Sequence, residues 1–379
     1  MESPDSSSGT SHTYNGMERY ADIVTRLLKY ALWHDRTSLD DKVFDGLSVD
    51  DWGGVHEFAL RQGVSAIVFD ALTDAGIILP RPIKMRFISA VSNIENEYAA
   101  KLKTAARLAE IYRSNGIRMM ILKGLGLSQL YPHPNHRPCC DIDIYLFGRQ
   151  READEILRKN YNIPIDEDKH HHTVFHIGKT MVENHYDFIE AHSRRSKPEL
   201  ELRLKAIAET EQPIRIEIGG QEAYIPSPNL NALFLTLHSG AHFAAGNISV
   251  RHLLDWSLFI DRFGENVEWE KVYALADEFG FRRYLDCLNT MCFDYLGLAK
   301  KPFITVSQEK DIVEKSWEDT LEYGKEHIPD NFIKGWIYRI DRRFANVWKQ
   351  RMVYRDDLVS SFLLSAAIHV IKPKYWRKD

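Results

Sequence analysis

The stretch that decides the fold is RMMILKGLGLSQLYPHPNHRPCCDIDIYL, residues 118–146. An apolar run meets Lys123-Gly124, an amphipathic segment follows, and Asp141-Ile142-Asp143 opens a second apolar run. A glycine between an apolar run and an amphipathic segment is typical of a strand that turns into a helix. The pattern therefore predicts a strand over 117–122, a tight turn, a helix over 124–131 and a strand over 141–146.

The two aspartates of this stretch are separated by one residue. In a strand, alternate side chains share a face, so Asp141 and Asp143 point the same way while Ile142 and Ile144 point into the core. Two carboxylates about 7 Å apart on one strand face repel each other unless a cation lies between them. A divalent metal is the natural occupant, which predicts a metal and phosphate site.

The chain after residue 146 supplies further strands. A polar helix is expected over 149–160, a hairpin over 173–177 and 180–188, and a second hairpin over 215–218 and 223–225. On strand 180–188, Glu183, His185 and Asp187 share one face. A third acidic residue can therefore join the aspartate pair from a neighbouring strand.

Both flanks of this block have helical periodicity. The expected helices cover 17–33, 50–60, 64–72 and 83–114 before the block, and 228–242, 249–260, 269–279, 284–296, 311–323 and 358–371 after it. The predicted organisation is a disordered leader (1–16), an N-terminal helical region (17–114), a catalytic core (115–226) and a C-terminal helical region (227–379). This is an α+β fold.

Composition excludes several classes of protein. The net charge of −5 argues against a chain that is basic throughout and binds nucleic acid by bulk electrostatics, so phosphate binding must be local. The four cysteines lack paired zinc spacing, and a reducing cytoplasm suits them best. No apolar stretch is long enough to span a bilayer.

The constellation Lys123-Gly124, Arg137, Asp141-Ile142-Asp143 and Val182-Glu183-Asn184-His185-Tyr186 is found in one order along the chain. It resembles the uncharacterised nucleotidyltransferase family of the polymerase-β-like superfamily, whose pattern is K-G…R…D-I-D-hydrophobic…V-E-x-H-aromatic. The segment from His238 to Asp255 also looks like the helical region that these proteins carry after the catalytic sheet.

The resemblance implies a mixed sheet with helices and a two-metal site for phosphoryl transfer. Asp141, Asp143 and a third carboxylate would hold Mg²⁺ or Mn²⁺, and Gly124 would let the chain approach the triphosphate of ATP or another nucleoside triphosphate. The chain has Lys123-Gly124 where the wider superfamily has Gly-Ser. Lys123 or Ser128 is then the candidate contact for the terminal phosphate.

Several residues have two interpretations. Glu183 is preferred to Asp187 as the third carboxylate because it matches the family motif. His185 either orients a ligand, contacts substrate or relays a proton, or is a buried hydrogen-bonded histidine.

The remaining alternatives concern basic groups. His172 shares a strand face with His176 and either joins a metal cluster or lies in a solvated loop. Arg137 either binds phosphate or faces solvent. His238 and His242 have the spacing of a zinc pair, but packing against the sheet is the preferred interpretation.

The expected function is the transfer of a nucleoside monophosphate from a nucleoside triphosphate to an acceptor hydroxyl, with release of pyrophosphate. A small molecule or a protein is the favoured acceptor, and the basic aromatic C-terminal tail keeps an RNA end open. The alternative is a catalytically inactive nucleotide-binding or protein-interaction module of the same fold.

Overall fold

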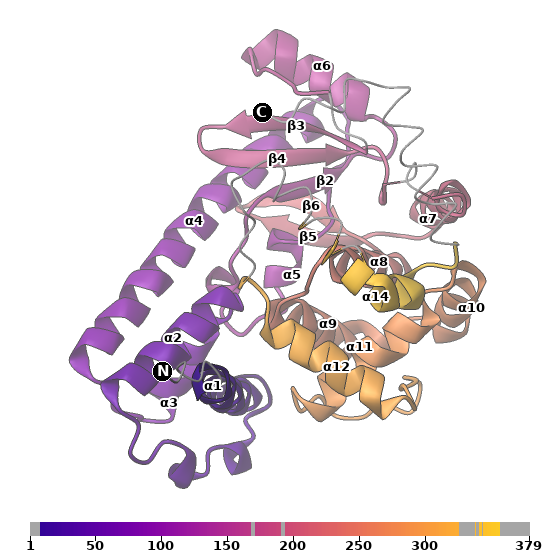
Figure 1. The fold of residues 1–379 in the computed structure, drawn as a ribbon. Helices are drawn as coiled ribbons and strands as arrows, with labels where there is room; N and C mark the ends of the chain where they lie inside the picture. Colours follow the sequence, from indigo (N-terminus) through magenta and orange to yellow (C-terminus); the bar gives the residue numbers. More distant parts are fainter. Residues whose placement is uncertain are drawn as a thin grey trace, which may run out of the picture.

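The computed structural model describes residues 8–167, 171–190, 194–325, 338, 341–342 and 344–356. The α-helices are α1 (Ser8–Trp33), α2 (Val49–Arg61), α3 (Ser65–Asp74), α4 (Arg81–Ser114), α5 (Leu125–Ser128), α6 (Gln150–Tyr161), α7 (Lys197–Thr210), α8 (Pro228–Ala245), α9 (Val250–Phe263), α10 (Trp269–Phe279), α11 (Arg282–Asp294), α12 (Lys310–Leu321) and α14 (Val347–Val353). The strands are β1 (Met120–Ile121), β2 (Ile142–Tyr145), β3 (His172–Ile177), β4 (Thr180–His185), β5 (Ile214–Ile218) and β6 (Gln221–Ile225). Figure 1 shows how they are arranged.

The strands form one mixed sheet in the order β3-β4-β2-β1-β6-β5. Both predicted hairpins are present as antiparallel pairs, β3 with β4 and β5 with β6. Strand β2 runs parallel to β4, and β1 runs antiparallel to β2 but parallel to β6. The predicted α+β class, with a mixed sheet between helical regions, is confirmed.

The two faces of the sheet pack against different cores. Ile142 and Ile144 of β2 belong to the core that also contains buried residues of α4 and α6. Tyr145 points to the opposite face and belongs to the larger core, which contains residues of α8 and α9. The predicted alternation of strand 141–146 is confirmed, and it turns Asp143 toward the C-terminal helices.

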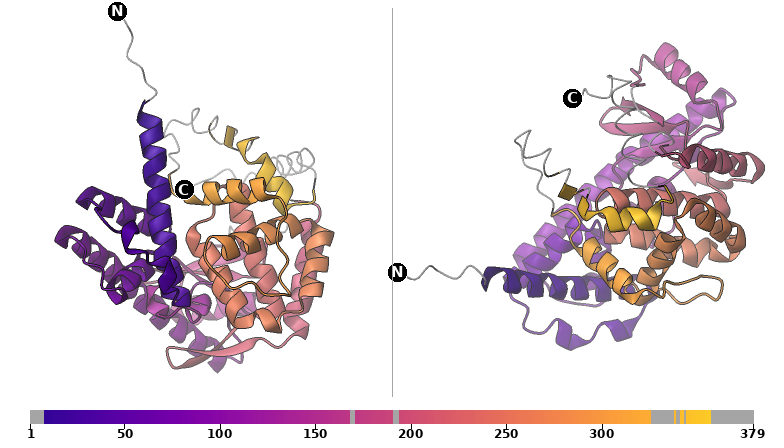
Figure 2. Two further views of the ribbon diagram at one scale, coloured as in Figure 1. Left: turned by 90° about the horizontal axis from the view of Figure 1, so that it is seen from below. Right: turned by 45° about the vertical axis from the view of Figure 1, so that its right-hand side comes forward.

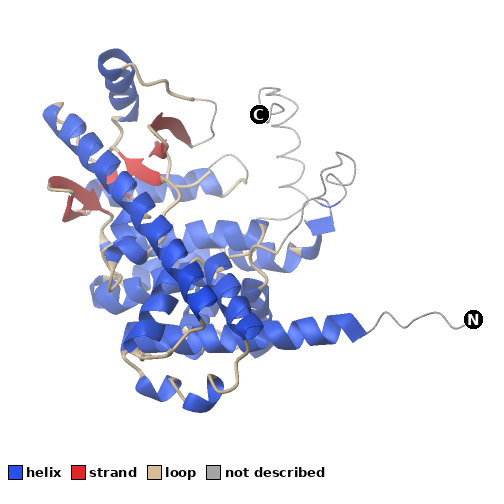
Figure 3. Ribbon diagram, turned by 90° about the vertical axis from the view of Figure 1, so that its left-hand side faces the viewer, coloured by secondary structure: helices blue, strands red, loops and turns tan. Residues whose placement is uncertain are grey.

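Helix α4 connects the N-terminal helices to the sheet, as Figures 1 and 3 show. It begins next to Pro82, where a missing N–H costs nothing, and it has no internal glycine. Helix α1 runs between the other N-terminal helices and the C-terminal helices (Figure 2), and the Trp33 indole donates to the Leu296 carbonyl at 2.7 Å. The N-terminal and C-terminal helices therefore share one hydrophobic core. This core holds both sets of helices in place relative to the sheet.

Four boundaries differ from the prediction. Helix α1 begins at Ser8, inside the segment predicted as a leader, and residues 1–7 lie outside the described part. Strand β1 is limited to two residues, Met120 and Ile121, which pair with β2, and Met120 also pairs with β6. The predicted helix 124–131 is the short α5, because its last turn leads into Pro132. The fourth difference is at the end of β4.

Strand β4 ends at His185 and does not continue to Phe188. The backbone N–H groups of Tyr186 and Asp187 both donate to the His171 carbonyl, at 3.1 and 3.2 Å, which ends the regular ladder. Asp187 therefore does not follow the alternation of β4.

The sequence pattern also gave no indication of α7, and the predicted helix over 358–371 lies outside the described residues. Within the described residues, no helix combines the length and the apolar composition that crossing a membrane requires.

Candidate active site

The acidic residues of β2 and β4 lie side by side. Asp143 and Glu183 are direct partners in the parallel register, and Tyr145 is opposite His185 one pair further on. The His185 Nε2 atom lies 3.1 Å from Asp143 Oδ1 and 3.5 Å from Glu183 Oε2. Ligand atoms of Asp143, Glu183 and His185 all fall within 4.8 Å of one another. The predicted convergence of carboxylates from two strands is thus present.

Lys123 and Asp141 complete this cluster from the segments beside the strands. The Lys123 ammonium lies 3.2 Å from Asp143 Oδ1 and 3.9 Å from Asp141 Oδ2. Burial alone would lower the pKa of Lys123, but the neighbouring carboxylates raise it, so the amine stays charged. Burial and the Asp143 charge raise the pKa of Asp141. Lys123 is therefore a cation between the two aspartates, as the repulsion argument requires.

Asp143 is fully buried and incompletely satisfied. Burial alone would raise its pKa, but Lys123 and then His185 lower it below the ordinary value, which keeps the group a carboxylate. Its Oδ1 atom is paired with both Lys123 and His185. Its Oδ2 atom is buried without a hydrogen-bond partner among the described residues. An unsatisfied buried carboxylate oxygen is costly unless a ligand satisfies it. Together with Glu183 it fits the oxygen ligands that Mg²⁺ and Mn²⁺ prefer.

Histidines surround the acidic pair on the β3 side. His172 is opposite His185 in the β3–β4 register, and its Nε2 atom lies 3.7 Å from Glu183 Oε1. Burial lowers the pKa of His172. In His185, burial alone would lower the pKa, but hydrogen bonds to Asp143 and Glu183 raise it to about 9. The structure therefore brings His172 and His185 to the site, and His176, also on β3, lies opposite Met181.

Two cavities meet at this cluster. Lys123, Asp141, His238 and His242 line both of them. The larger has a volume of about 620 Å³ and extends past Glu183 between α7, α8 and α14. The smaller has a volume of about 230 Å³ and extends past Gly124 and Arg137 toward Arg251. The acidic cluster thus opens into two separate binding spaces.

Gly124 makes the junction possible. Its φ is +58°, a conformation that favours glycine, and a Cβ atom built on it would lie 3.4 Å from the Asp141 carbonyl oxygen. A larger residue would strain the turn that brings Lys123 beside the aspartates. Gly124 lines the smaller cavity, and its place near phosphate stays a prediction.

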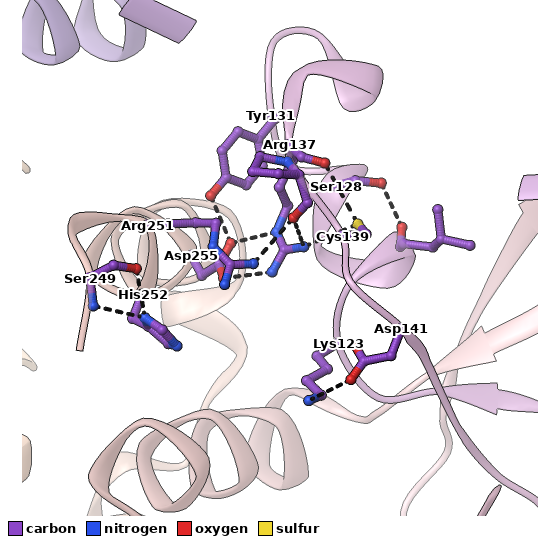
Figure 4. A network of polar contacts seen from close by, with 12 residues as sticks. Lys123, Ser128, Tyr131, Arg137, Cys139, Asp141, Ser249, Arg251, His252 and Asp255 are labelled. Carbon is purple, nitrogen blue, oxygen red and sulfur yellow. Dashed lines mark hydrogen bonds and ion pairs between the residues drawn. The ribbon is translucent and has the colours of Figure 1, made fainter. Parts of the chain in front are cut away.

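Ser128 is not brought to the site. Its side chain is buried, and its hydroxyl donates to the Leu125 carbonyl at 2.7 Å. In Figure 4 it lies apart from the Lys123–Asp141 pair. A helix of four residues leaves the Ser128 hydroxyl bonded to its own first turn, and the phosphate contact of Ser128 stays a prediction.

Arg137 and Asp187 are also engaged elsewhere. Arg137 is buried in a bidentate pair with Asp255, with both N–O distances at 2.7 Å, so it does not face solvent. It also lines the smaller cavity, and its contact with phosphate stays a prediction. Asp187 pairs with Lys205 of α7. Of the two candidates for the third carboxylate, the structure places Glu183 at the cluster.

Comparison with known families agrees with this geometry. The model of the family described as uncharacterised nucleotidyltransferase matches residues 48–297, which is more than half of the chain. The chain belongs to this nucleotidyltransferase family. The family assignment made from the Lys-Gly, Asp-Ile-Asp and Val-Glu-x-His motifs is confirmed. The matched region contains α2 to α11, and hence the whole sheet and the helices that carry His238 and Arg251.

The other comparisons add little. The chain is similar to a solved structure of an antigenic nucleotidyltransferase-like protein from Paracoccidioides brasiliensis. The identity is 18%, the match covers 47% of this chain and 88% of that chain, and the TM-score is 0.32. No curated protein matches the chain significantly.

The sequence of this nucleotidyltransferase family member did not indicate which residues of its C-terminal helices line the cavities. Arg251 and His252 of α9 line the smaller cavity, as do His238 and His242 of α8. The spacing of the α8 pair was visible in the sequence, but no sequence signal placed α9 against the same cavity. Helix α7 was also missed, and its Glu201 carboxylate accepts three backbone N–H bonds from Phe188 and Ile189, which fixes the chain beyond β4.

Proposed function

We propose that this protein transfers a nucleoside monophosphate from a nucleoside triphosphate to an acceptor hydroxyl in a reaction that depends on Mg²⁺ or Mn²⁺. The carrying observation is the buried Asp143 Oδ2 atom, which has no partner among the described residues, on a residue paired in the sheet with Glu183, a residue that lines the larger cavity. A carboxylate pair of this kind is suited to hold divalent cations.

The reaction has simple requirements. The acceptor oxygen attacks the α-phosphorus, the bond from that phosphorus to the bridging oxygen of the β-phosphate breaks, and the hydroxyl proton is lost to a base as pyrophosphate leaves. Asp143, Glu183 and Asp141 would hold the cations, which lower the pKa of the acceptor hydroxyl and neutralise the leaving group. The remaining side chains must keep these carboxylates ionised and in place.

His185 and Lys123 meet that requirement. With its pKa raised to about 9, His185 is protonated at neutral pH and donates from Nε2 toward both Asp143 and Glu183. It is a positioning residue, because it acts through the carboxylates that it holds together. Lys123 supplies a point charge at the mouth of the smaller cavity, where it is also available to a phosphate oxygen.

The larger cavity supports an acceptor of limited size. Its walls combine apolar residues of α7, α8 and α14 with the charged Glu190 and Lys197. A space of about 620 Å³ is within the range of small-molecule sites and also admits one protein side chain. A small molecule or a protein side chain is therefore favoured as acceptor over an RNA end.

The test is pyrophosphate release. The full-length protein is incubated with each nucleoside triphosphate and Mg²⁺ or Mn²⁺, with a cell extract as the source of acceptors. Release that is abolished by Asp143→Asn supports the proposal. The absence of release with every nucleotide, metal and acceptor would contradict it.

One observation favours a second candidate, a nucleotide-binding module without turnover. The turn has Lys123-Gly124 in place of Gly-Ser, and the nearby Ser128 hydroxyl is bonded within α5. In that case a non-hydrolysable triphosphate binds with a dependence on Asp143, yet no pyrophosphate is released with any acceptor.

A further inference from the structure

Three histidines from two helices converge on the smaller cavity. His238 and His242 lie one turn apart on α8, and His252 lies in the first turn of α9. The ring centroids are 4.7 Å apart for His238 and His242, and 5.7 Å apart for His242 and His252. One ring nitrogen from each falls within 4.8 Å of the other two. Such a cluster either binds a metal ion or donates N–H groups to an anion.

The hydrogen bond of His252 favours an anion. Its Nδ1 atom accepts from the backbone N–H of Ser249 at 3.1 Å, as part of the capping box that begins α9. A neutral imidazole whose Nδ1 accepts carries its proton on Nε2, so that nitrogen is a donor and not a metal ligand. A three-histidine metal site would have to break this cap.

The charges around the three histidines also favour an anion over a metal ion. Burial and then the Lys123 charge lower the pKa of His238. Partial desolvation in the cavity wall, then the charges of Lys123 and Arg251, lower the pKa of His242. The Asp143 charge raises the pKa of His238 and the Asp255 charge raises that of His252, but both pKa values stay below the ordinary value. Asp255, however, is committed to Arg137. Two cations near the histidines favour an anion over a second metal ion.

Arg251 differs from Arg137 in its partners. Its Nη1 atom donates to the Pro138 carbonyl at 3.1 Å, and no carboxylate of the described residues lies within ion-pair distance of it. Figure 4 shows Arg251 on the same helix as His252 and Asp255, across from the segment that carries Arg137. Arg251 lines the smaller cavity, so its remaining N–H donors are available there.

We propose that the smaller cavity binds the pyrophosphate part of the nucleoside triphosphate through Arg251 and the imidazole N–H groups of His238, His242 and His252. This deepens the proposed function, on which it rests, because it names the groups that hold the leaving pyrophosphate. Lys123 and Gly124 close the cavity on the side of the carboxylates. Helices α8 and α9 thereby supply the phosphate contacts that the Lys-Gly turn lacks.

The test is the binding of inorganic pyrophosphate to the full-length protein, measured by calorimetry in a buffer with Mg²⁺. Arg251→Gln is expected to weaken binding about 10- to 100-fold, the value of a hydrogen bond to a charged group. Arg251→Lys should restore part of the affinity. The matched control is Arg215→Gln, because Arg215 is 74% exposed and pairs with Glu222 in the β5–β6 hairpin. It should bind pyrophosphate as the wild type does.

His242→Gln provides a second variant, because His242 is exposed and its loss should leave the fold intact. It should weaken pyrophosphate binding as well, by a smaller factor. Unchanged affinity in both folded variants would overturn the proposal. Stoichiometric Zn²⁺ binding that His242→Gln abolishes would also overturn it, in favour of a metal site.

No nucleotide or acceptor is present in this experiment. Pyrophosphate binding that depends on Arg251 therefore supports the anion site even if no nucleotidyl transfer is found. Transfer that depends on Asp143 but not on Arg251 would sustain the proposed function and contradict the anion site.

Discussion

Two buried aspartates of this molecule have cationic partners, and they differ in whether both of their carboxylate oxygens have a partner. Asp255 receives both arms of the Arg137 guanidinium at 2.7 Å and the Tyr131 hydroxyl at 2.7 Å. Asp143 receives Lys123 and His185 on one oxygen only, and its other oxygen has no partner among the described residues. Burial raises the cost of every missing hydrogen bond, so this difference is energetic as well as geometric.

The comparison separates a structural ion pair from a site. Asp255 joins α9 to the segment between α5 and β2, and Figure 4 shows Tyr131 and Arg137 of that segment next to it. Asp143 is paired in the sheet with Glu183, which lines the larger cavity, and its Oδ2 acceptor has no partner among the described residues. A fully satisfied buried carboxylate stabilises the fold, whereas a partly satisfied one is prepared for a ligand.

The largest expected effect is on the structural pair. Asp255→Asn leaves the Arg137 guanidinium buried without a compensating charge, which should cost about 3–5 kcal/mol in the free energy of unfolding. Urea unfolding followed by circular dichroism measures it. A loss of less than about 1 kcal/mol, as for an exposed ion pair, would break the contrast with Asp143.

The second effect is on activity. Asp143→Asn should lower pyrophosphate release more than about 100-fold, beyond the roughly 10- to 100-fold cost of losing a partner around a metal ligand. The fold should persist, because Asp141 stays beside Lys123 and Glu183 stays beside His185, so both groups keep a neighbouring carboxylate. Ser128→Ala is the matched control, since its hydroxyl is bonded within α5, and it should keep its activity. Equal losses in both variants would show that Asp143 acts only through the fold.

The third effect separates the two candidates for the third carboxylate. Glu183→Gln should lower activity about 10- to 100-fold, because the residue lies beside Asp143. Asp187→Asn should leave activity nearly unchanged, because Asp187 pairs with Lys205 outside the cluster. Steady-state rates of the two purified variants decide the question. A larger loss of activity in Asp187→Asn than in Glu183→Gln would instead identify Asp187, beyond the end of β4, as the third carboxylate.

The smallest effect concerns pH. The pKa of His185 is about 9 in the folded protein against an ordinary value of 6.5, so the folded state binds its proton more tightly. Its contribution is complete below pH 6.5 and is lost as the pH rises through 9, so the stability of the metal-free protein should fall across that window. The fall should be on the order of 1–3 kcal/mol. His185→Gln should show a flatter profile in urea unfolding with EDTA, and an identical slope would contradict this origin.

Much of the sheet could be predicted from the sequence because strand alternation is a local rule. The parity of residues 141–146 placed Asp143 and Ile144 on opposite faces, and the hairpin pattern placed Glu183 and His185 on one face of the next strand. Each inference needed only a few neighbouring residues and a fixed period. The register that sets Asp143 beside Glu183 then followed from the parallel pairing of β2 and β4.

The errors have a common physical cause, which is that hydrogen-bond partners come from distant segments. Nothing near Arg137 in the sequence indicates that Asp255 will satisfy its guanidinium, and nothing near Asp187 indicates Lys205. The proposed contact of Arg251 with pyrophosphate could not be predicted for the same reason, because the wall of the smaller cavity forms only when α8 and α9 pack against the sheet. A charged residue near a motif is available to a ligand only if the fold leaves it without another partner.

The most direct test of the central claim is Mn²⁺ binding, followed by electron paramagnetic resonance in the presence of a non-hydrolysable nucleoside triphosphate. Asp143 and Glu183 are proposed to hold the cation, so Asp143→Asn should weaken Mn²⁺ binding by at least about tenfold, or 1.4 kcal/mol. We expect this loss while the circular dichroism spectrum stays that of the wild type. Mn²⁺ affinity that is the same in the wild type and in a folded Asp143→Asn variant would contradict it.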